Sequence, residues 1–473
     1  MSQFQLSPQV QDMKVFFVHS SDLDGRLDPI YYYSVNNLEI VNKTTYPVKK
    51  LSEVIEMTRG RFGHRPRNDP RFYGGEYPFI QTGDIVRASN SNGKITYSQT
   101  LNELGLKTSR LFDKPVVVIT IAANIGDTAI LDYPACFPDS LIGMQPKNDS
   151  LTLGYINLYF KFIRQYLNDL APQSAQKNIN YQQLAPIPIV VPPLDVQSGA
   201  VCIYDAALAQ QAQKKQQAAA LLASIDEYLL GELGITLPEQ DNSLEKRVFR
   251  VSSRELSGGR FDPIAFSAAH ASLFKAKYSY SQLKEKAYYF KSGFGAGRQD
   301  QTNSENGVFQ LRPTNINRDG ELIFDKKVFV SVSEAANFQL KHEDVLFNNT
   351  NSQELVGKTA LLLNPVNQFT YSNHITVIRT YNDLNPQYLQ NVLNLYQACK
   401  YFYSICTNWN NQSGVGVELL KSVRVPIPPL EKQNEIVTHI QSIRIEAAQL
   451  QAEATQVLAD AKAQIERIIL GDS

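Results

Sequence analysis

The stretch VPIPPLEKQ, residues 425–433, places two consecutive prolines directly before a charged segment, and the similar VVPPLDVQ occurs at residues 190–197. Proline fixes its own φ at about −65° and disfavours helical backbone in the residue before it. The prolines therefore predict an extended exit from a globular body. A helix is expected to follow at Leu194 or Leu430, with an acidic residue in its first turn.

The proline motif is one part of a duplication that extends over the whole chain. GRLDPI at 25–30 recurs as GRFDPI at 259–264, and IGDTAIL at 125–131 recurs as VGKTALL at 356–362. These matches keep the same order along the chain, so they indicate a duplicated domain rather than a repeat array. A further match of Ile225 and Gly231 to Ile465 and Gly471 predicts that the second helix is longer by about four residues, close to one turn.

Each half has the pattern of a mixed α/β body followed by a long helix. Residues 116–121 and 371–380 are β-branched or aromatic runs that favour strands. Residues 151–170 and 386–402 carry apolar side chains at three- and four-residue spacing, which favours helices. Turns are expected at Gly74-Gly75, Asn92-Gly93 and Asp319-Gly320.

The two long segments after the prolines have a heptad pattern of apolar residues. The pattern runs from Ile436 to Ile468 with one polar position at Gln464, and the first copy runs from Val201 to Leu229. Gln211 and Lys215 interrupt the first copy and are expected to help fix its register. The helices should be roughly 34 and 40 residues long, or about 50–60 Å, and should end at Gly231 and Gly471.

An antiparallel pair of these helices would hold the two bodies apart, related by an approximate two-fold axis. Two similar bodies on such a spacer suit a DNA target made of two half-sites. The predicted fold is therefore mixed α/β (α+β), with two similar globular domains, two long antiparallel coiled-coil helices and pseudo-two-fold symmetry. The predicted boundaries are an N-terminal segment 1–19, a first body 20–191, a helical region 192–235, a linker 236–250, a second body 251–427 and a helical region 428–473.

Composition limits the classes of protein to which the chain can belong. It has 473 residues, 43% of them hydrophobic and 19% charged, with 46 Lys plus Arg against 46 Asp plus Glu. The zero net charge argues against a globally basic nucleic-acid binder, although local basic patches still bind phosphates. There is no membrane-length apolar run and no signal-peptide layout at the N-terminus. The four cysteines lack metal-ligand spacing, which favours reduced thiols in a cytoplasm.

The sequence contains no motif of an enzyme active site. It has no Asn/Asp-Pro-Pro-aromatic motif of an adenine methyltransferase and no Walker A pattern. GFGAG at 293–297 lacks the Lys-Ser/Thr of a phosphate-binding loop, so we interpret it as a flexible turn rather than a phosphate cradle. Histidines and cysteines form no zinc spacing. No catalytic residue and no metal site are expected.

The duplicated motifs resemble one known family. IPIVVPPLDVQ (187–197), VPIPPLEKQ (425–433) and SIDEYLLGELGI (224–235) are similar to the repeated regions of the specificity subunit of type I restriction-modification enzymes. The pair Asp195-Val196 departs from the family, which often has Glu and a second charge there. The resemblance covers essentially the whole chain.

The resemblance implies a non-catalytic subunit whose two bodies are target recognition domains, each reading one half of a bipartite double-stranded DNA site. The helices would set the spacing and dock modification (methyltransferase) subunits, which methylate adenine with S-adenosylmethionine. Restriction subunits that use ATP and Mg would join them in defence against phage, so no cofactor is expected on this chain. The helix-start residues expected at the partner contacts are Pro192, Pro193, Gln197, Pro428, Pro429 and Gln433.

Two glycine-containing basic segments are the main candidates for DNA contact. The first, 59–71, carries Arg59, Arg61, His64, Arg65, Arg67 and Arg71 against one acid, Asp69; the second, 291–300, carries Lys291, Arg298 and Gln299. Arginine on a loop reaches phosphates or guanine edges. The alternative is a solvated basic loop without a ligand.

Other polar residues are weaker candidates for base contacts, since Asn and Gln pair with adenine but also serve in turns. These are Gln81, Thr82, Arg87, Arg312, Asn315, Asn348, Asn349 and Asn351. Near the end of each body, Gln173, Gln176 and Lys177 align with Trp409, Gln412 and Ser413, in loops that would face DNA or a partner.

A second hypothesis remains open at this point. The chain could be a structural adaptor, in which duplicated α/β domains and a coiled coil assemble other proteins without touching DNA. The basic glycine-containing segments in both bodies favour DNA recognition, whereas the neutral total charge favours the adaptor.

Overall fold

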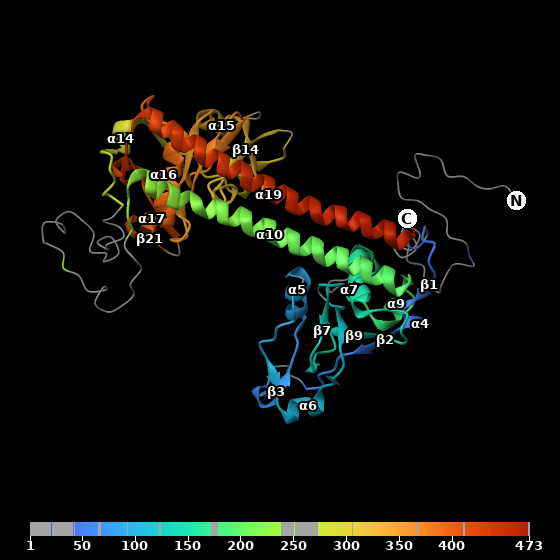
Figure 1. Cartoon of the computed structure of the whole chain (residues 1–473). Coiled ribbons are helices and arrows are strands. Elements are labelled where there is room, and N and C mark those ends of the chain that lie inside the picture. Colours follow the sequence, from blue (N-terminus) through green and yellow to red (C-terminus); the bar gives the residue numbers. More distant parts are fainter. Residues whose placement is uncertain are drawn as a thin grey trace. The chain divides into compact units, whose positions relative to one another are not determined.

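The computed structural model describes residues 20, 41, 43–64, 68–91, 93–122, 124–171, 178–237, 250, 273–304, 306–365, 368–409 and 412–471. The chain divides into a first unit, Met1–Lys214 with Ala452–Ser473, and a second unit, Lys215–Gln451. Both divisions fall inside the two long helices, α10 (Leu194–Leu233) and α19 (Leu430–Leu470) (Figure 1). Each unit thus contains the start of one long helix and the end of the other.

The body of the first unit is built on a four-stranded antiparallel sheet in the order β2-β9-β6-β7. Its strands are β1 (Val48–Lys50), β2 (Ile55–Arg59), β3 (Tyr73–Pro78), β4 (Thr100–Leu101), β5 (Leu111–Phe112), β6 (Val116–Thr120), β7 (Thr128–Leu131), β8 (Ala135–Cys136), β9 (Leu141–Pro146) and β10 (Pro188–Val190). Its helices are α4 (Leu51–Val54), η2 (Pro70–Phe72), α5 (Thr82–Ser91), α6 (Glu103–Thr108), α7 (Leu153–Phe162), α8 (Arg164–Leu170) and α9 (Tyr181–Leu184).

Both faces of this sheet are buried, which is why the central strand β6 has no polar face. Val117 and Ile119 belong to the core that includes Tyr155 and Tyr159 of α7. Val116 and Val118 point to the opposite face, because side chains alternate along a strand, and pack with Ile85 of α5 and other residues. The strand predicted at 116–121 is confirmed, and the helix predicted at 151–170 is divided into α7 and α8.

The body of the second unit repeats the sheet with the order β12-β20-β16-β18. Its strands are β11 (Tyr280–Gln282), β12 (Ala287–Ser292), β13 (Gln301–Thr302), β14 (Gly307–Leu311), β15 (Phe329–Ser331), β16 (Asp344–Asn348), β17 (Thr350–Asn351), β18 (Thr359–Leu362), β19 (Phe369–Tyr371), β20 (Ile375–Thr380), β21 (Thr407–Trp409), β22 (Gln412–Gly414) and β23 (Arg424–Pro426). Its helices are α14 (Leu283–Lys286), η4 (Arg298–Asp300), η5 (Pro313–Asn315), α15 (Val332–Ala335), η6 (Ala336–Phe338), α16 (Pro386–Ala398), α17 (Tyr401–Ile405) and α18 (Val417–Ser422).

The two bodies differ in what covers the second face of the sheet. In the first unit α5 lies on that face, whereas in the second unit Leu346 and Val377 pack with Phe309 and Leu311 of β14. β14 belongs to a second sheet, in the order β13-β15-β14-β19. The mixed α/β fold predicted from the sequence is confirmed. The first unit has a smaller counterpart of the second sheet, in which β3 pairs antiparallel with β4 and Phe79 forms a parallel bridge with Cys136, as β14 pairs with β15 and with β19.

The proline joint is fixed to its body in the same way in both units. The last strand before the prolines pairs with the first strand of the body, β10 with β1 and β23 with β11. Tyr155 of α7 donates its hydroxyl to Val190 O at 3.0 Å, and Tyr388 of α16 donates to Pro426 O at 2.9 Å. α10 accordingly begins beside α7 (Figure 1).

The long helices keep one register, which corrects the predicted four-residue insertion. Equivalent buried positions of the two repeats are always 236 residues apart along the chain. They are Ala200 and Ile436, Tyr204 and Ile440, Ala207 and Ile443, Ala218 and Ala454, Ile225 and Ala461, Leu229 and Ile465, and Leu233 and Ile469. α10 and α19 have 40 and 41 residues. The predicted match of Ile225 to Ile465 was therefore wrong by four residues.

The predicted heptad seam holds as far as Ala461 and then changes. Ile465 and Ile469 are buried, whereas Gln464 is exposed and Ile468 is half-buried. The last turns leave the coiled-coil spacing because Ile465 and Ile469 join the core of the body. Gln464 was predicted as the one polar position of the seam, but it lies outside the buried seam.

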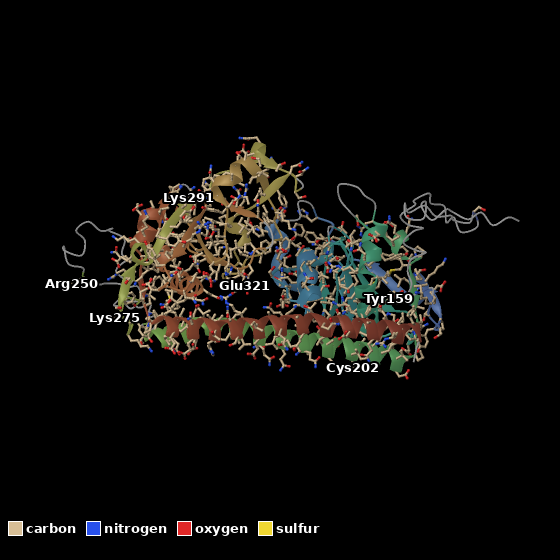
Figure 2. The ribbon with its side chains drawn as sticks, turned by 90° about the horizontal axis from the view of Figure 1, so that it is seen from above. Tyr159, Cys202, Arg250, Lys275, Lys291 and Glu321 are labelled. Carbon is tan, nitrogen blue, oxygen red and sulfur yellow. The ribbon has the colours of Figure 1, made fainter. Side chains whose placement is uncertain are left out.

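Within each unit the two helix segments run antiparallel, as predicted. In the first unit Gln211 Nε2 donates to Ala454 O at 3.0 Å, and Lys214 Nζ lies 2.7 Å from Glu453 Oε2. Lys215, predicted in the seam, is exposed, so the neighbouring Lys214 makes the contact instead. Cys202 of α10 is exposed, on the side away from the body (Figure 2).

In the second unit the helix contacts follow the same antiparallel direction. Lys432 Nζ pairs with Glu232 Oε2 at 2.8 Å, and the rings of Tyr228 and His439 lie 4.1 Å apart.

The glycine that ends α10 is not the predicted one. Gly231 lies inside the helix, and Gly234 ends it with φ +68°. Ile235 N donates back to Leu230 O, as in a Schellman C-cap. Gly471, with φ +84°, ends α19 as predicted. Gly74 has φ +82° but lies within β3, at a register shift, rather than in a free turn.

Candidate nucleic-acid interface

Most of the candidate residues lie at or near one end of the four-stranded sheet in each unit. In the first unit β2 ends at Arg59 opposite Ile142, and β6 ends at Thr120 opposite Leu141. In the second unit β12 ends at Ser292 opposite Thr376, and β16 ends at Asn348 opposite Ile375. The basic segments 59–71 and 291–300 therefore leave corresponding ends of corresponding strands. We call this region the reading end of each unit.

Each of the two basic segments has a glycine, Gly60 or Gly293, at a place where another part of the backbone approaches closely. A Cβ on Gly60 would lie 2.3 Å from Pro138 O, and one on Gly293 would lie 2.1 Å from Tyr371 O. Gly60 N donates to Leu141 O and Gly293 N to Ile375 O at matching places. Close backbone approach thus explains these two glycines, and they say nothing by themselves about a ligand.

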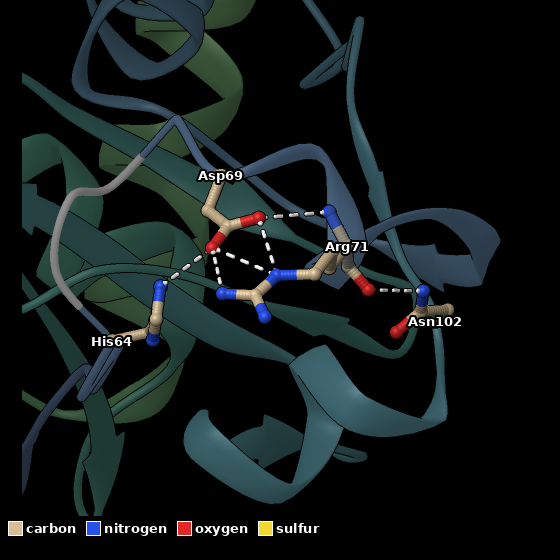
Figure 3. A network of polar contacts seen from close by, with 4 residues as sticks. All are labelled: His64, Asp69, Arg71 and Asn102. Carbon is tan, nitrogen blue, oxygen red and sulfur yellow. Dashed lines mark hydrogen bonds and ion pairs between the residues drawn. The ribbon is translucent and has the colours of Figure 1, made fainter.

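The segment 59–71 is partly neutralised by its one acid (Figure 3). The Arg71 guanidinium lies 2.6 Å from Asp69 Oδ2, and His64 Nε2 lies 3.0 Å from the same oxygen. Arg71 O accepts from Asn102 Nδ2 at 2.9 Å, and the His64 ring stacks on Phe72 at 4.0 Å.

This network limits the positive charge that the segment presents. Hydrogen bonds from the Arg71 side chain and backbone hold the pKa of the Asp69 carboxyl far below its usual range. Asp69 is therefore ionised at neutral pH and offsets one cation. Arg65 and Arg67 lie outside the described residues, so their prediction is unchanged.

The remaining cations of the first unit differ in how they are held. Arg59 Nε donates to Asp139 O at 2.6 Å, while the Arg61 side chain is exposed. Arg87, on α5, is exposed and pairs with the buried Asp84, which also accepts from Gln81 N at 2.7 Å. Among the described arginines of 59–71, Arg61 alone has an exposed side chain without an acidic or carbonyl partner.

A cavity of about 450 Å³ lies beside this network. Gln81 lines it, and Gln81 Nε2 donates to Gln99 Oε1 at 2.9 Å. Sequence reasoning proposed Gln81 but missed Gln99 and Asn68, which line the same cavity, because they come from different loops. Thr82 Oγ1 lies 3.1 Å from Ser140 Oγ, so Thr82 connects α5 to the start of β9.

In the second unit the segment 291–300 is anchored rather than loose. Lys291 of β12, labelled in Figure 2, donates its Nζ to Asn337 O at 3.0 Å and lies over the Phe338 ring. Phe294 O accepts from Gln310 Nε2 at 3.1 Å. The interpretation of 293–297 as a flexible turn is therefore corrected, whereas Arg298 and Gln299 are exposed as a DNA contact requires.

Arg312, the residue that directly follows β14, supports this segment. Its guanidinium donates to Gln310 Oε1 at 3.1 Å and to Ala296 O at 3.0 Å. Burial lowers the pKa of Arg312, and burial followed by the Arg312 charge lowers the pKa of His374. Because Arg312 Nε and Nη2 donate to groups of the protein, we interpret Arg312 as a residue that supports the segment.

The asparagines predicted to read bases are largely structural. Asn315 and Asn348 are 1% and 0% exposed. Asn315 Nδ2 donates to Ile323 O and Lys326 O, and Asn348 Nδ2 donates to Thr350 O and His374 O. Asn349 is 7% exposed, with its amide on Ser292 Oγ, Asn373 O and Thr376 Oγ1. Buried polar groups are satisfied internally, so these three side chains support the fold in this structure, and their contact with bases stays a prediction. Asn351, half-buried, donates to Asn348 Oδ1.

A small three-stranded sheet, β17-β22-β21, continues from the reading end of the second unit. It places Trp409 on the edge strand β21, 47% exposed, and Gln412 opposite it. Ser413 is buried and donates to Asn408 Oδ1. Gln173, Gln176 and Lys177 lie outside the described residues.

The residues expected at partner contacts divide into two classes. Gln197 and Gln433 are fully buried within their own units, where they belong to the helix start rather than to an exposed surface. Pro192 and Pro428 are buried as well, whereas Pro193 and Pro429 are exposed.

Among the described residues, no helix combines the length and apolar character needed to span a membrane. The same part of the chain contains no group of three or more His, Cys, Asp or Glu side chains arranged to hold a metal ion.

Comparison with known proteins gives a consistent family. The model of the Type I restriction modification DNA specificity domain matches residues 43–222 and 275–458, together more than half of the chain. A putative type I restriction enzyme MjaX specificity subunit from Methanocaldococcus jannaschii is 29% identical over 108 residues. That match covers 23% of this chain and 25% of the relative, so the chain matches about a quarter of the relative's length.

One solved structure shows the same fold at low identity. A chain from work described as "Structural basis underlying complex assembly and conformational transition of the type I R-M system" is 13% identical, with a TM-score of 0.57 over 90% of this chain and 96% of that chain. The HsdS subunit from Thermoanaerobacter tengcongensis is 14% identical, with a TM-score of 0.43 over 90% of this chain and 97% of that one.

Proposed function

Because this chain belongs to the type I restriction-modification DNA specificity family, we propose that it recognises double-stranded DNA for a type I restriction-modification enzyme. In this proposal each unit reads one half of a bipartite site at its reading end. The chain performs no chemistry itself. Phosphate contacts come from exposed cations such as Arg61, Arg87 and Arg298, and base contacts come from amides such as Gln81 and Gln299.

One observation carries this proposal. The two units share their scaffold down to single backbone hydrogen bonds, such as Gly60 N to Leu141 O and Gly293 N to Ile375 O. The described side chains at their reading ends nevertheless differ: the first unit has the Asp69–Arg71 pair, and the second has Trp409 and Arg298. A common scaffold with different polar side chains is what reading two different half-sites requires.

The partners follow from the proposed role. Modification subunits, which carry S-adenosylmethionine, would dock on the exposed faces of α10 and α19 near Pro193 and Pro429. Restriction subunits would supply ATP- and Mg-dependent cleavage. The experiment is to express the chain with its neighbouring methyltransferase in a methylation-free host and to map N6-methyladenine across the genome. The expected result is one split motif with a fixed central gap.

The control is the same methyltransferase expressed without this chain, which should leave no such motif. Methylation that is independent of the chain, or that lacks a split motif, contradicts DNA recognition and favours a purely structural adaptor.

A further inference from the structure

Trp409 is the only tryptophan of the chain, and it lies on an edge strand where the residue is 47% exposed. Tryptophan is highly buried on average in proteins. A half-exposed tryptophan on a sheet edge therefore needs a physical explanation. Two observations bear on it: what holds the indole in place, and what surrounds it.

The indole is held by a glycine on the neighbouring strand. Trp409 pairs with Gln412 in the register of β21 and β22, so Gly414 lies diagonally across on the same face. A Cβ on Gly414 would lie 2.4 Å from Cη2 of the Trp409 ring. The six-membered ring therefore covers the glycine backbone. Covering a strand glycine stabilises the hairpin, but Trp409 as a residue remains 47% exposed.

The hairpin is joined to the reading end of the second unit by hydrogen bonds. β22 pairs with β17 through Thr350 and Asn351, which follow β16 after one intervening residue, Asn349. Val415 N donates to Asn349 O, and the Asn349 amide reaches Ser292 Oγ at the end of β12. The ring is thus positioned on the same sheet end from which the segment 291–300, with Arg298 and Gln299, leaves.

The surroundings of the ring are amides and hydroxyls rather than an apolar patch. All three residues of β21, Thr407, Asn408 and Trp409, are exposed, and so is Gln412. A protein partner's hot spot would be expected to have an apolar surround. A flat ring amid hydrogen-bonding groups instead matches nucleic acid, because every base offers a π face and polar edges.

We infer that Trp409 is a stacking platform for a DNA base at the reading end of the second unit. Gly414 holds the indole in a fixed orientation, so little side-chain entropy is lost when a base stacks on the ring. This inference rests on the proposed DNA recognition and adds a contact residue to it. It requires the base to leave or open its stack locally, as bases do at protein-induced kinks.

The test uses the single tryptophan as a spectroscopic probe. The chain is labelled with 5-fluorotryptophan and assembled with its unlabelled methyltransferase, so that one 19F resonance reports on Trp409. Duplexes carry the mapped split site, the site with its first half scrambled, or the site with its second half scrambled. The expected result is a shifted resonance with the intact site, retained when one particular half is scrambled and lost when the other is.

Affinity of the assembled complex for the intact duplex gives the second readout. Trp409→Ala should weaken binding by about 5- to 150-fold, the range for loss of one base–aromatic stack, and Trp409→Phe should recover part of it. Tyr288→Ala is the matched control, because Tyr288 is an aromatic residue 60% exposed near the start of β12, at the opposite end of the same sheet. It should bind like the parent.

The outcomes are separable. DNA-dependent methylation with an unmoved resonance and unchanged affinity of Trp409→Ala would overturn this inference and leave the proposed function intact. Loss of methyltransferase association in Trp409→Ala would place the ring in a protein interface instead, which also overturns it. Absence of any DNA binding by the parent complex would refute the proposed function itself.

Discussion

Gln197 joins the start of α10 to the start of α7 through Thr152. Gln197 Oε1 accepts from Thr152 N at 2.9 Å, and Gln197 Nε2 donates to Ser150 O at 2.7 Å and to Pro192 O at 2.9 Å. In the second unit Gln433 makes the same contacts with Asn385 N, Asp383 O and Pro428 O. Thr152 and Asn385 are the N-caps of α7 and α16. The glutamine of the repeated motif therefore fixes the angle between body and helix.

The first prediction concerns this glutamine. Gln197→Ala should lower the free energy of unfolding of the first unit by about 2–4 kcal/mol, because each buried group left without a partner costs about 1–3 kcal/mol. Urea denaturation followed by far-UV circular dichroism measures the change. Gln210→Ala, at an exposed position of the same helix, should stay within about 0.5 kcal/mol of the parent. Equal effects of the two substitutions would contradict the assigned role.

The second prediction compares the effect of a glycine-to-alanine substitution at two positions. Gly293→Ala should destabilise the second unit by about 1–3 kcal/mol or more, because its Cβ would meet the carbonyl oxygen of Tyr371. Gly199→Ala should stabilise by about 0.5–1 kcal/mol, since it lies in α10 with nothing within 4 Å of the added Cβ. Thermal unfolding measures both. A tolerated Gly293→Ala would mean that the backbone moves aside at the reading end.

The third prediction concerns charge at the reading end of the first unit. Asp69→Asn keeps an oxygen to accept from Arg71 N but removes the carboxylate that neutralises Arg71. We expect tighter DNA binding and a salt dependence steeper by up to about 0.9 in log–log slope, the value for one added phosphate contact. Fluorescence anisotropy at several salt concentrations measures this.

Arg71→Ala is the opposite change and should weaken binding. If Asp69→Asn weakens it as well, the carboxylate positions Arg71 for contact instead of masking it.

The fourth prediction concerns pH and His374. Burial and the nearby Arg312 charge lower the pKa of His374 in the folded protein, so the unfolded chain takes up its proton first as pH falls. The stability that depends on a neutral imidazole is present above the ordinary histidine pKa of about 6.5 and is lost as pH falls through the lower folded value. The midpoint of thermal unfolding should therefore fall less between pH 7.5 and 5.0 for His374→Gln than for the parent. Identical pH profiles would contradict the shift.

The fifth prediction concerns the shared register of the long helices. Removing one heptad from both, residues 212–218 and 448–454, keeps the buried positions in phase and shortens each helix by about 10 Å. That length is about three base pairs at 3.4 Å each. Methylation mapping should show a changed gap, or no methylation, with unaltered half-site sequences. Altered half-site sequences would show that the helices do not set the spacing.

Part of the candidate site was predictable from sequence and part was not. The basic segments 59–71 and 291–300 were identified from composition, and they do lie at corresponding sheet ends. Their charge was overestimated, because the Asp69–Arg71 pair depends on loop geometry. The burial of Asn348 could not be predicted, because exposed and buried asparagines are identical in sequence. Gln99 was missed because only the folded loops bring it to Gln81.

The sequence by itself determined the duplication, the proline joints, the long helices and most of their apolar seam. These depend on local backbone limits and on periodicity along one element, which a single chain displays directly. The tertiary structure decided what Gln197 and Gly293 do and how the last turns at Ile465 leave the heptad spacing. Each of those depends on contacts between residues far apart in sequence, whose burial and hydrogen bonding exist only once the units have folded.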